Sequence, residues 1–335
     1  STQGGVAFNL LLSSLTYMFM PTRECRWRRA LTVAAFVGAG GVASGDARAP
    51  NHRQGSFMGA RGAQSFCSTG GGWVLDWEDE FDGDRLNASS WHVVTSTGRG
   101  DISLPIASLN ITACREARCR HENVHVAGGN LVIRSDRGPE GVTSGAVTTK
   151  GHRAWSGDPS PFRLCVRARL PGVGTGHRGQ GIWPAHWMLP ENGRSDRCLD
   201  EGEMDITEMI NVDGTVYHTY HWLSSWPGKT CGDFDKYHKS KATWAPVKDF
   251  ASEFHEYAVE RTKDRVVYAV DGRVVFSASA REEGFTLSRS PFFLILNTAV
   301  GGGWPGHVSP ETEFPVEHII DSVRVVRGVP GFVVV

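Results

Sequence analysis

From residue 71 onward the sequence predicts an all-β sandwich. Short runs rich in β-branched and aromatic residues alternate with Gly, Pro and Asp turns, and no long segment shows the periodicity of a helix. The runs that predict strands are 123–126, 130–134, 164–170, 215–220, 256–261, 266–270 and 323–327. The sequence VVYAVDGRVVFSA predicts a hairpin that turns at Asp271 and Gly272. All-β domains of about 200–250 residues are common, so residues 71–330 are expected to form one domain.

Residues 1–70 are expected to be a leader and low-complexity segment, removed or disordered in the mature protein. The sequence RWRR at 26–29 precedes an apolar run, a pattern typical of a secretory signal with cleavage near 43–49. Because the pattern lies far from the start of the chain, there are two alternatives to a cleaved signal: a signal anchor at 6–20, or an artefact of the gene model. The 6–20 run is shorter than the ~18 residues of a membrane span, which favours a secreted or cell-wall-associated protein.

Cysteine usage also favours an oxidising compartment. Of the seven cysteines one lies in the leader, and the remaining even set is compatible with disulfides: Cys67, Cys114, Cys119, Cys165, Cys198 and Cys231. Six cysteines allow 15 pairings, and a Cys198–Cys231 bridge is one candidate. The glycosylation patterns at Asn87 and Asn110 fit export. A formal net charge of −1, with no basic cluster beyond 26–29, disfavours nucleic acid as a partner.

Three carboxylates lie close together in the sequence EMDITE at 203–208. Alternation along a strand places Glu203 and Asp205 on one face and Glu208 on the other. A β-bulge at Ile206 or Thr207 would bring all three to the same face. The flanking Trp, Met, Tyr and His residues predict a half-buried strand rather than a solvated one.

A row of carboxylates destabilises a sheet unless chemistry requires it, because like charges raise one another's pKa. Retaining glycoside hydrolysis requires such a pair: an ionised nucleophile and a protonated acid about 5–5.5 Å apart. Inverting hydrolysis needs a wider separation, ~6.5–9.5 Å, to admit a water molecule. The spacing of Glu203 and Glu208 on a bulged strand favours the retaining arrangement.

The segments WPAHWML at 183–189 and GEMDITE at 202–208 resemble glycoside hydrolase family 16 in its laminarinase-like branch. Further segments match in family order, among them ENVHVAGGNLVI, FHEYAVE and NTAVGGGWPG, so that the resemblance covers about residues 73 to 328. It implies a concanavalin-like β-jelly-roll of two antiparallel sheets with a concave substrate cleft. Two positions depart from the family pattern, Ala146 and Arg261, and neither belongs to the carboxylate motif.

The resemblance also implies roles and an activity. Glu203 corresponds to the nucleophile, Glu208 to the general acid/base, and Asp205 to the residue that hydrogen-bonds the nucleophile. The implied activity is that of a secreted retaining endo-β-glucanase acting on β-1,3-glucan, and we expect a monomer. Alternatives are a transglycosylase, a hydrolase of mixed-linkage glucan, agar or carrageenan, and a glucan-binding protein without activity. The extra residue in the motif argues against the xyloglucan transglycosylase pattern, ExDxE, and glucan-binding relatives typically lose the carboxylates.

Sugar rings pack their C–H faces on aromatic side chains, so a glycan-binding surface combines aromatic and polar residues. The candidate substrate-binding residues are Trp183, His186, Trp187, His221, Trp222, Asn297 and Trp304. Trp183 and Trp187 share strand parity, so if these two belong to the core, His186 faces the cleft. The family resemblance is what suggests His221 and Asn297.

Metal sites receive little support from the sequence. His218 and His221 fall on opposite faces of a strand, so we expect no catalytic metal and no cofactor for catalysis. Members of the family hold a structural calcium through an aspartate at the position of Asp321, and calcium requires six to eight oxygen ligands. A structural calcium at Asp321 is therefore an optional expectation.

Overall fold

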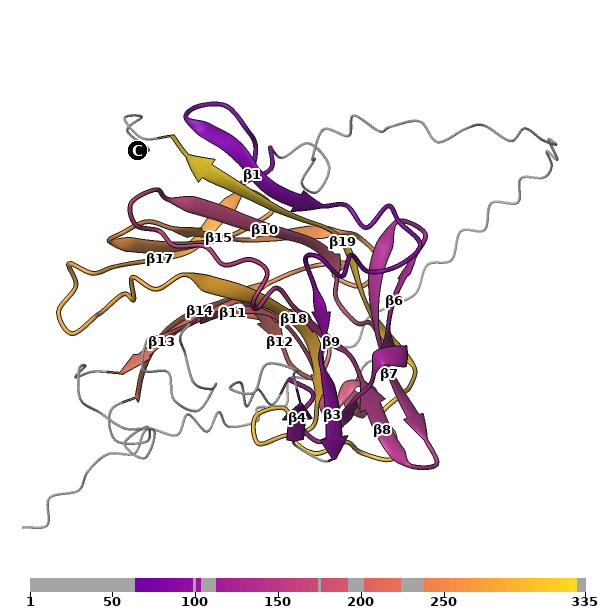
Figure 1. Cartoon of the computed structure of the whole chain (residues 1–335). Coiled ribbons are helices and arrows are strands. Elements are labelled where there is room, and N and C mark those ends of the chain that lie inside the picture. The colour runs from indigo at the N-terminus through magenta and orange to yellow at the C-terminus, as the bar shows by residue number, and fades with distance from the viewer. Residues whose placement is uncertain are drawn as a thin grey trace, which may run out of the picture. The chain divides into compact units, whose positions relative to one another are not determined.

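The computed structural model describes residues 64–98, 101–103, 113–173, 176–191, 202–223 and 238–329. Within these residues the chain is almost entirely β-structure, as predicted, and two large sheets face each other (Figure 1). In the described ranges two short 3₁₀ turns interrupt the strands, η2 (His121–Asn123) and η3 (Gly176–Gly179). No helix in the described part of the chain is long and apolar enough to span a membrane.

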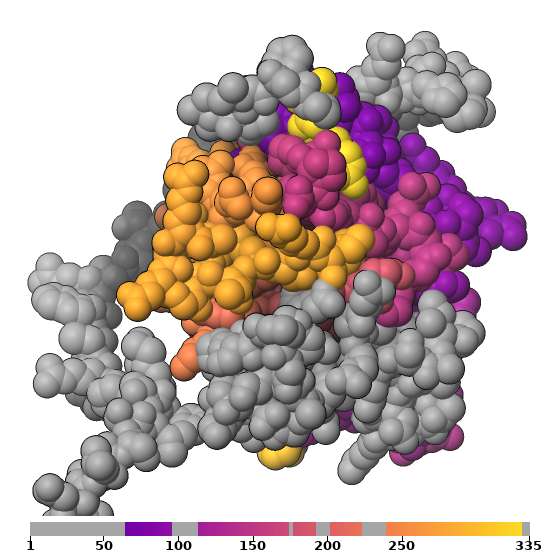
Figure 2. All heavy atoms as spheres, turned by 60° about the vertical axis from the view of Figure 1, so that its left-hand side comes forward, coloured from indigo at the N-terminus to yellow at the C-terminus, as the bar shows by residue number. Residues whose placement is uncertain are grey.

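The first sheet is antiparallel except where β5 pairs with β8. In spatial order it contains β17 (Arg273–Ser279), β16 (Arg265–Val270), β15 (His255–Arg261), β10 (Phe162–Arg169), β19 (Val316–Gly328), β7 (Asn130–Gly138), β8 (Gly141–Ser144) and β5 (Arg118–Cys119). Two further strands flank this path, β1 (Trp73–Asp79) on β19 and β6 (Val124–Ala127) on β7. Figure 2 shows the result on the surface: yellow C-terminal atoms lie between indigo and magenta ones, because β19 pairs with both β1 and β10.

The second sheet carries the acidic strand. Its order is β14 (His238–Pro246), β13 (Thr215–Leu223), β12 (Glu203–Met209), β11 (Ile182–Pro190), β18 (Phe292–Val300), β9 (Ala146–Thr148) and β2 (His92–Val93), with antiparallel pairing throughout these strands. A separate ribbon joins β3 (Thr95–Gly98) to β4 (Asp101–Ser103). Each run that the sequence analysis assigned to a strand overlaps a strand of the structure.

The predicted hairpin is confirmed between β16 and β17. Val270 pairs with Arg273, which leaves Asp271 and Gly272 as a two-residue turn. Both turn residues have positive φ, 49° and 74°, as the mirror-image turn of a tight hairpin requires. Glycine is needed at the second position for another reason as well, since a Cβ there would lie 2.5 Å from the carbonyl oxygen of Gln64.

The main core fills the space between the two sheets. The first sheet contributes branched and aromatic side chains, including those of Leu131, Leu164, Val166, Val259, Tyr268, Val323 and Val325, all buried. The second sheet contributes Met188, Met204, Ile206, Met209, Tyr220, Leu294 and Leu296. Because Met204, Ile206 and Met209 of β12 enter this core, its carboxylates are left to the outer face of the second sheet.

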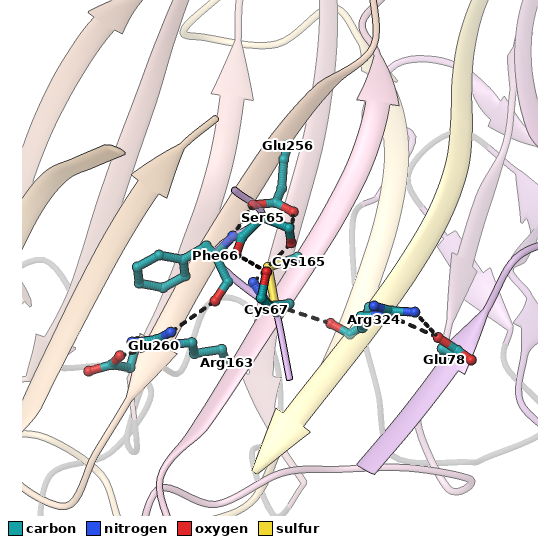
Figure 3. Close-up of a disulfide and its surroundings, with 10 residues drawn as sticks. Ser65, Phe66, Cys67, Glu78, Arg163, Cys165, Glu256, Glu260 and Arg324 are labelled. Carbon is teal, nitrogen blue, oxygen red and sulfur yellow. Dashed lines mark hydrogen bonds and ion pairs between the residues drawn. A yellow bond between two sulfur atoms is a disulfide. The ribbon is translucent and has the colours of Figure 1, made fainter. Parts of the chain in front are cut away.

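A disulfide between Cys67 and Cys165 fastens the segment before β1 to β10 (Figure 3). Beside it the Glu256 carboxylate accepts hydrogen bonds from Ser65 Oγ and from the Phe66 amide, the latter at 2.7 Å. Residues 64–70, which the sequence analysis assigned to the leader, are thus attached to the sandwich. The signal pattern at 26–29, the Asn110 glycosylation pattern, Cys198 and Cys231 lie outside the described residues, so the predictions about them stay predictions.

Replacing both Cys67 and Cys165 with alanine should lower the free energy of unfolding by about 4–5 kcal/mol, because the bridge closes a loop of roughly 100 residues. Removing Cys114 and Cys119 in the same way should cost only about 2 kcal/mol, since that bridge spans five positions. Urea unfolding of the two double variants measures the difference. Equal losses would contradict the loop-closure explanation.

Candidate active site

The predicted bulge in β12 is present. On β13 the partners of Asp205 and Glu208 are Thr219 and Tyr217, so one residue of β13 lies opposite two of β12. On β11 the pairing passes from Thr207 directly to Asp205 and leaves Ile206 without a partner in the register. The bulge confirms the location inferred from the sequence.

The bulge places the three carboxylates on one face. Across β13 they lie opposite alternate residues, because Glu203 pairs with His221, Asp205 with Thr219 and Glu208 with Tyr217. Side chains at directly paired positions project from the same side of a sheet, and residues two apart on a strand share a face. We call this outer face of the second sheet the acidic face.

Glu203 and Asp205 form a hydrogen-bonded pair. Asp205 is buried, and this burial raises its pKa to about 7, while the hydrogen bond with Glu203 acts in the opposite direction. His221 Nε2 lies 3.0 Å from Asp205 Oδ2. The hydrogen bond favours the ionised form of Asp205 while burial favours the neutral form, so the two carboxyl groups can share a proton near neutral pH.

Glu208 lies in a different environment. The pKa of Glu208 is raised to about 8. The largest cause is the loss of water around its carboxyl group, and the second is the negative charge of Asp205. His221, a hydrogen bond from Trp183 and the charge of Arg115 act in the lowering direction. At neutral pH Glu208 is thus mainly protonated, which is the form that a general acid requires.

Aromatic rings surround Glu208. Trp183 Nε1 donates a hydrogen bond to Glu208 Oε1 at 3.0 Å. The ring of Trp304 meets Trp183 edge-on with centroids 5.3 Å apart, and Tyr217 meets Trp304 at 5.0 Å. Trp304 remains 44% exposed, so these rings offer an apolar surface to a ligand beside the acid.

Trp187 and Asn297 support the site from beneath. Trp187 Nε1 donates to Asn297 Oδ1 at 2.7 Å, and Asn297 Nδ2 donates to the carbonyl oxygen of Ala113 at 2.7 Å. Both side chains are buried, Asn297 to 3% exposure, and the amide of Asn297 is engaged at both ends. The structure therefore gives Asn297 a supporting position rather than a surface for sugar.

The expectation that His186 faces the cleft is wrong. Trp187 pairs with Asp205, so the tryptophans of β11 lie on the acidic face and His186, of opposite parity, points between the sheets. There it is fully buried, with its Nε2 2.9 Å from His318 Nε2 and its ring against Tyr257. Parity correctly separated His186 from Trp183 and Trp187, but the tryptophans lie on the acidic face and the histidine lies between the sheets.

Trp222 is also a core residue. It follows His221 on β13 and so points to the opposite side of the sheet. Its ring packs against Phe285 with centroids 4.8 Å apart, and its Nε1 donates to the carbonyl oxygen of Gly284. The expected separation of His218 from His221 is confirmed, since His218 is fully buried and its Nδ1 lies 2.6 Å from the Ile206 carbonyl oxygen.

Three residues of this region were missing from the sequence-based prediction. A straight row of paired positions runs from Glu208 through Tyr217 to Trp244, which is 63% exposed on β14. Tyr217 could have been predicted from the sequence, because it lies four residues before His221 and therefore on the same strand face. Arg115 was not, since its loop reaches the site from a distant part of the chain.

Comparison with known proteins identifies the family. The model of glycosyl hydrolases family 16 matches residues 125–319, more than half of the chain. The chain belongs to glycosyl hydrolases family 16. As a family 16 member it is a glycoside hydrolase, and the sandwich described above is the family's jelly-roll.

The relatives of this family 16 chain include glucanases from distant organisms. It is 32% identical to a beta-glucanase of Rhodothermus marinus over 277 residues, covering 77% of this chain and 86% of that protein. Identity to a glucan endo-1,3-beta-glucosidase of Cryptopygus antarcticus is 32%, over 72% of this chain and 86% of the relative. The solved endo-beta-1,3-glucanase of Pyrococcus furiosus is 29% identical with a TM-score of 0.60, covering 77% of this chain and 96% of that one.

One group of described residues in this family 16 domain brings possible metal ligands together. Donor atoms of Glu203, Asp205 and His221 all lie within 4.8 Å of one another. The group is already linked internally, by the bond between the two carboxyl groups and by the approach of His221 to Asp205. We therefore describe it as a hydrogen-bonded cluster and assign no ion to it.

The expected calcium ligand, Asp321, is occupied by an ion pair. Its Oδ2 accepts a hydrogen bond from Arg167 Nη1 at 2.8 Å and a longer one from Ser322 Oγ at 3.3 Å. The charge of this carboxylate is thus balanced within the protein, and a hard cation would have to compete with the guanidinium. We derive no step through calcium, and the site at Asp321 stays a prediction.

Replacing Trp183 with phenylalanine should raise the pKa of Glu208 above its value of about 8, because the indole N–H stabilises the ionised carboxylate. A ¹³C-NMR titration of the Glu208 carboxyl carbon measures the shift. Trp187→Phe is the matched control, since its N–H bonds Asn297 instead of a carboxylate. A lower pKa in Trp183→Phe, or the same rise in both variants, would contradict this role.

Proposed function

We propose that this chain is a secreted, retaining endo-β-glucanase that hydrolyses β-1,3-glucan. The observation that carries the proposal is the bulged strand β12, which presents Glu203 and Glu208 on one face in different electrostatic environments. The relatives named as endo-1,3-β-glucosidases support the choice of substrate, and the two disulfides among the described residues support export.

In the first step Glu203 acts as the nucleophile. Its carboxylate attacks the anomeric carbon and forms a glycosyl ester while the glycosidic C–O bond breaks. Glu208 gives its proton to the departing oxygen, so the leaving sugar departs as a neutral alcohol. Asp205 is hydrogen-bonded to Glu203, and we assign to it the adjustment of the nucleophile's charge as the ester forms.

In the second step Glu208 acts as the base. Once it has lost its proton it takes one from a water molecule, and the resulting nucleophile attacks the anomeric carbon. The ester bond breaks, Glu203 is restored as a carboxylate, and Glu208 is protonated again. Two displacements at the same carbon retain the β configuration.

Glu203→Gln and Glu208→Gln should each lower the turnover of laminarin by at least about 100-fold while leaving the fold intact, because each variant lacks an ionisable group that the two steps need. Reducing-sugar release measures turnover, and circular dichroism measures folding. Glu122→Gln, which alters an exposed glutamate away from the acidic face, serves as the control.

The same preparations test the finer parts of the proposal. Wild-type activity on laminarin, with lichenan, agar and carrageenan in parallel, tests the substrate, and ¹H-NMR of the first products tests retention. Full activity in either active-site variant, or products of α configuration, would overturn the mechanism. Binding to laminarin with no hydrolysis would favour a glucan-binding protein, and transfer to added oligosaccharide a transglycosylase.

The pH profile should follow the protonation of Glu208. The acid works only when protonated, so kcat/KM should fall as pH rises through the Glu208 pKa of about 8. Asp205→Asn removes a negative charge that raises this pKa, so the basic limb should move to lower pH in that variant. Initial rates on laminarin between pH 5 and pH 10 measure both effects, and an upward shift in Asp205→Asn would contradict the assignment.

A further inference from the structure

The loop at 113–119 is closed by the Cys114–Cys119 disulfide. Inside it the Ala117 amide donates to the Cys114 carbonyl oxygen, and Arg115 has a left-handed backbone with φ of 54°. A side-chain-bearing residue adopts that conformation only when its surroundings compel it, at a cost of about 1–3 kcal/mol. The side chain of Arg115 is exposed, so the strain does not serve to bury it.

This loop is anchored to the end of β18. The Glu116 amide donates to the Val300 carbonyl oxygen at 3.0 Å, and the Val300 amide donates back to Cys114 at 3.3 Å. The Glu116 carboxylate pairs with His307 and lies against Gly301, where a Cβ would approach it to 2.2 Å. Together with the bond from Asn297 to Ala113, these contacts fix the loop beside the acidic face.

The loop delivers the guanidinium of Arg115 to the ring of Trp183. The Cζ atom lies 4.9 Å from the ring centroid, within the range of a cation–π contact. Trp183 in turn donates its N–H to Glu208. Among the residues that the structure describes, no carboxylate forms an ion pair with Arg115, whereas Arg118 of the same loop pairs with Glu140 at 2.9 Å.

We propose that Arg115 is a positioning residue for the general acid. The disulfide-closed loop holds its guanidinium on Trp183, and this contact keeps the indole N–H on Glu208 while placing a fixed positive charge nearby. The inference rests on the proposed role of Glu208 as the acid/base. It makes the Cys114–Cys119 bridge part of the catalytic apparatus through the position of Arg115.

The charged and titratable groups around Glu208 determine the direction in which the loss of Arg115 would shift the Glu208 pKa. Asp205 from β12 raises the pKa of Glu208, whereas His221 from β13 and Arg115 from the loop lower it. Tyr217 of β13 pairs with Glu208 across the strands and is neutral near pH 8, because burial raises its pKa. On β11 the neighbouring group is the neutral indole of Trp183.

Removing Arg115 should therefore raise the pKa of Glu208 in two ways that act in the same direction. The positive charge is lost, and the indole that donates to the ionised carboxylate is no longer held by the guanidinium. The basic limb of kcat/KM on laminarin should move to higher pH by about half a unit, as expected for a charge at the edge of a partly solvated site.

The first test compares pH profiles of Arg115→Gln and Arg118→Gln, which remove one positive charge each from the same loop. Arg115→Gln should shift the basic limb upward, and Arg118→Gln should leave it at the wild-type position. Arg115→Lys keeps the charge without the planar stacking group, so its shift should be smaller than that of Arg115→Gln. No shift in Arg115→Gln, or an equal shift in Arg118→Gln, would overturn the proposal.

The second test removes the disulfide. Cys114→Ala/Cys119→Ala should reproduce the upward shift of Arg115→Gln, and Cys67→Ala/Cys165→Ala should not, although it loses more stability. A wild-type profile in the Cys114/Cys119 variant would show that the bridge does not hold Arg115 in place. Thermal unfolding of each variant establishes that the measured enzyme is folded.

A direct titration separates this inference from the proposed function. The ¹³C resonance of the Glu208 carboxyl reports its pKa in folded wild-type, Arg115→Gln and Arg118→Gln proteins without any substrate. If the wild type hydrolyses none of the glucans, the proposed function fails, and the titration still decides whether Arg115 controls Glu208. An unchanged Glu208 pKa in Arg115→Gln would overturn the inference even in an active glucanase.

Discussion

The site depends on one extra residue in β12. A regular strand would send the Glu208 side chain between the sheets, where its carboxyl group would be cut off from water. The bulge avoids this, and the side chains of Ile206 and Thr207 are the ones that become fully buried. The carbonyl oxygen of Ile206, in the bulge, has side-chain partners, because Thr207 Oγ1 and His218 Nδ1 both approach it. Burial lowers the pKa of His218 to about 4, so the ring stays neutral in this position.

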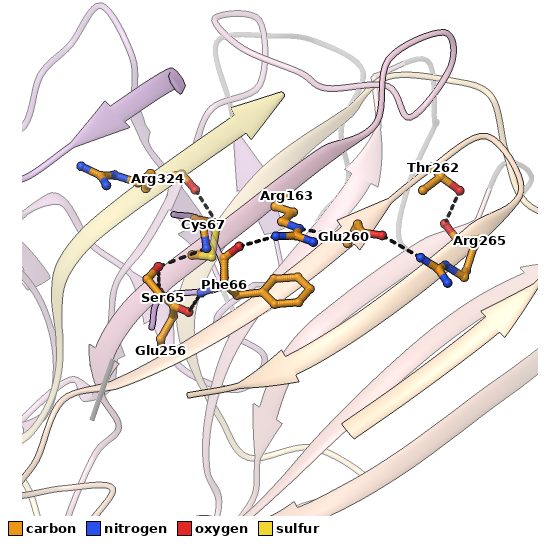
Figure 4. Close-up of polar contacts among 10 residues, drawn as sticks. Ser65, Phe66, Cys67, Arg163, Glu256, Glu260, Thr262, Arg265 and Arg324 are labelled. Carbon is orange, nitrogen blue, oxygen red and sulfur yellow. Dashed lines mark hydrogen bonds and ion pairs between the residues drawn. A yellow bond between two sulfur atoms is a disulfide. The ribbon is translucent and has the colours of Figure 1, made fainter. Parts of the chain in front are cut away.

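Glu260 on the first sheet and Glu208 on the second have opposite kinds of partner. On the first sheet Glu260 is only 2% exposed, yet Arg163 and Arg265 hold its two oxygens at 2.8 and 3.1 Å (Figure 4). Such pairing balances the charge of a buried carboxylate within the protein. On the acidic face Glu208 accepts a hydrogen bond from the neutral indole of Trp183, and desolvation outweighs the opposing effects of His221 and Arg115, so the proton is retained. Glu260 and Glu208 are thus distinguished by their partners.

Rigidity around the acid comes from segments far away in the chain. The loop at 113–119 approaches from one side, and its first carbonyl is held by Asn297 of β18, which also receives the N–H of Trp187. Towards β14, Trp244 continues the row of paired positions from Glu208 through Tyr217 and is 63% exposed. A site framed in this way has a fixed acid and an exposed aromatic surface beside it, which suits a polymer that passes across a sheet.

Much of this protein was determined by local sequence. Strand periodicity and turn residues predicted the sandwich, the hairpin at Asp271 and Gly272, and a bulge within 203–208, because these features depend on neighbours in the chain. The side of the sheet to which each residue points was a different matter. Parity showed that His186 and Trp187 point in opposite directions, but it could not show which direction faces the core, and the choice made for His186 was wrong for that reason.

Only the tertiary structure decided the contacts between distant segments. Six cysteines allow 15 pairings, and the packing of the first sheet selects Cys67 with Cys165 while the 113–119 loop selects Cys114 with Cys119. The approach of Arg115 to Trp183 depends on the same packing and leaves no periodic signal in the sequence. Local patterns therefore specify which residues could perform chemistry, whereas the raised pKa of Glu208 follows from desolvation and charges that exist only once the sheets and loops are assembled.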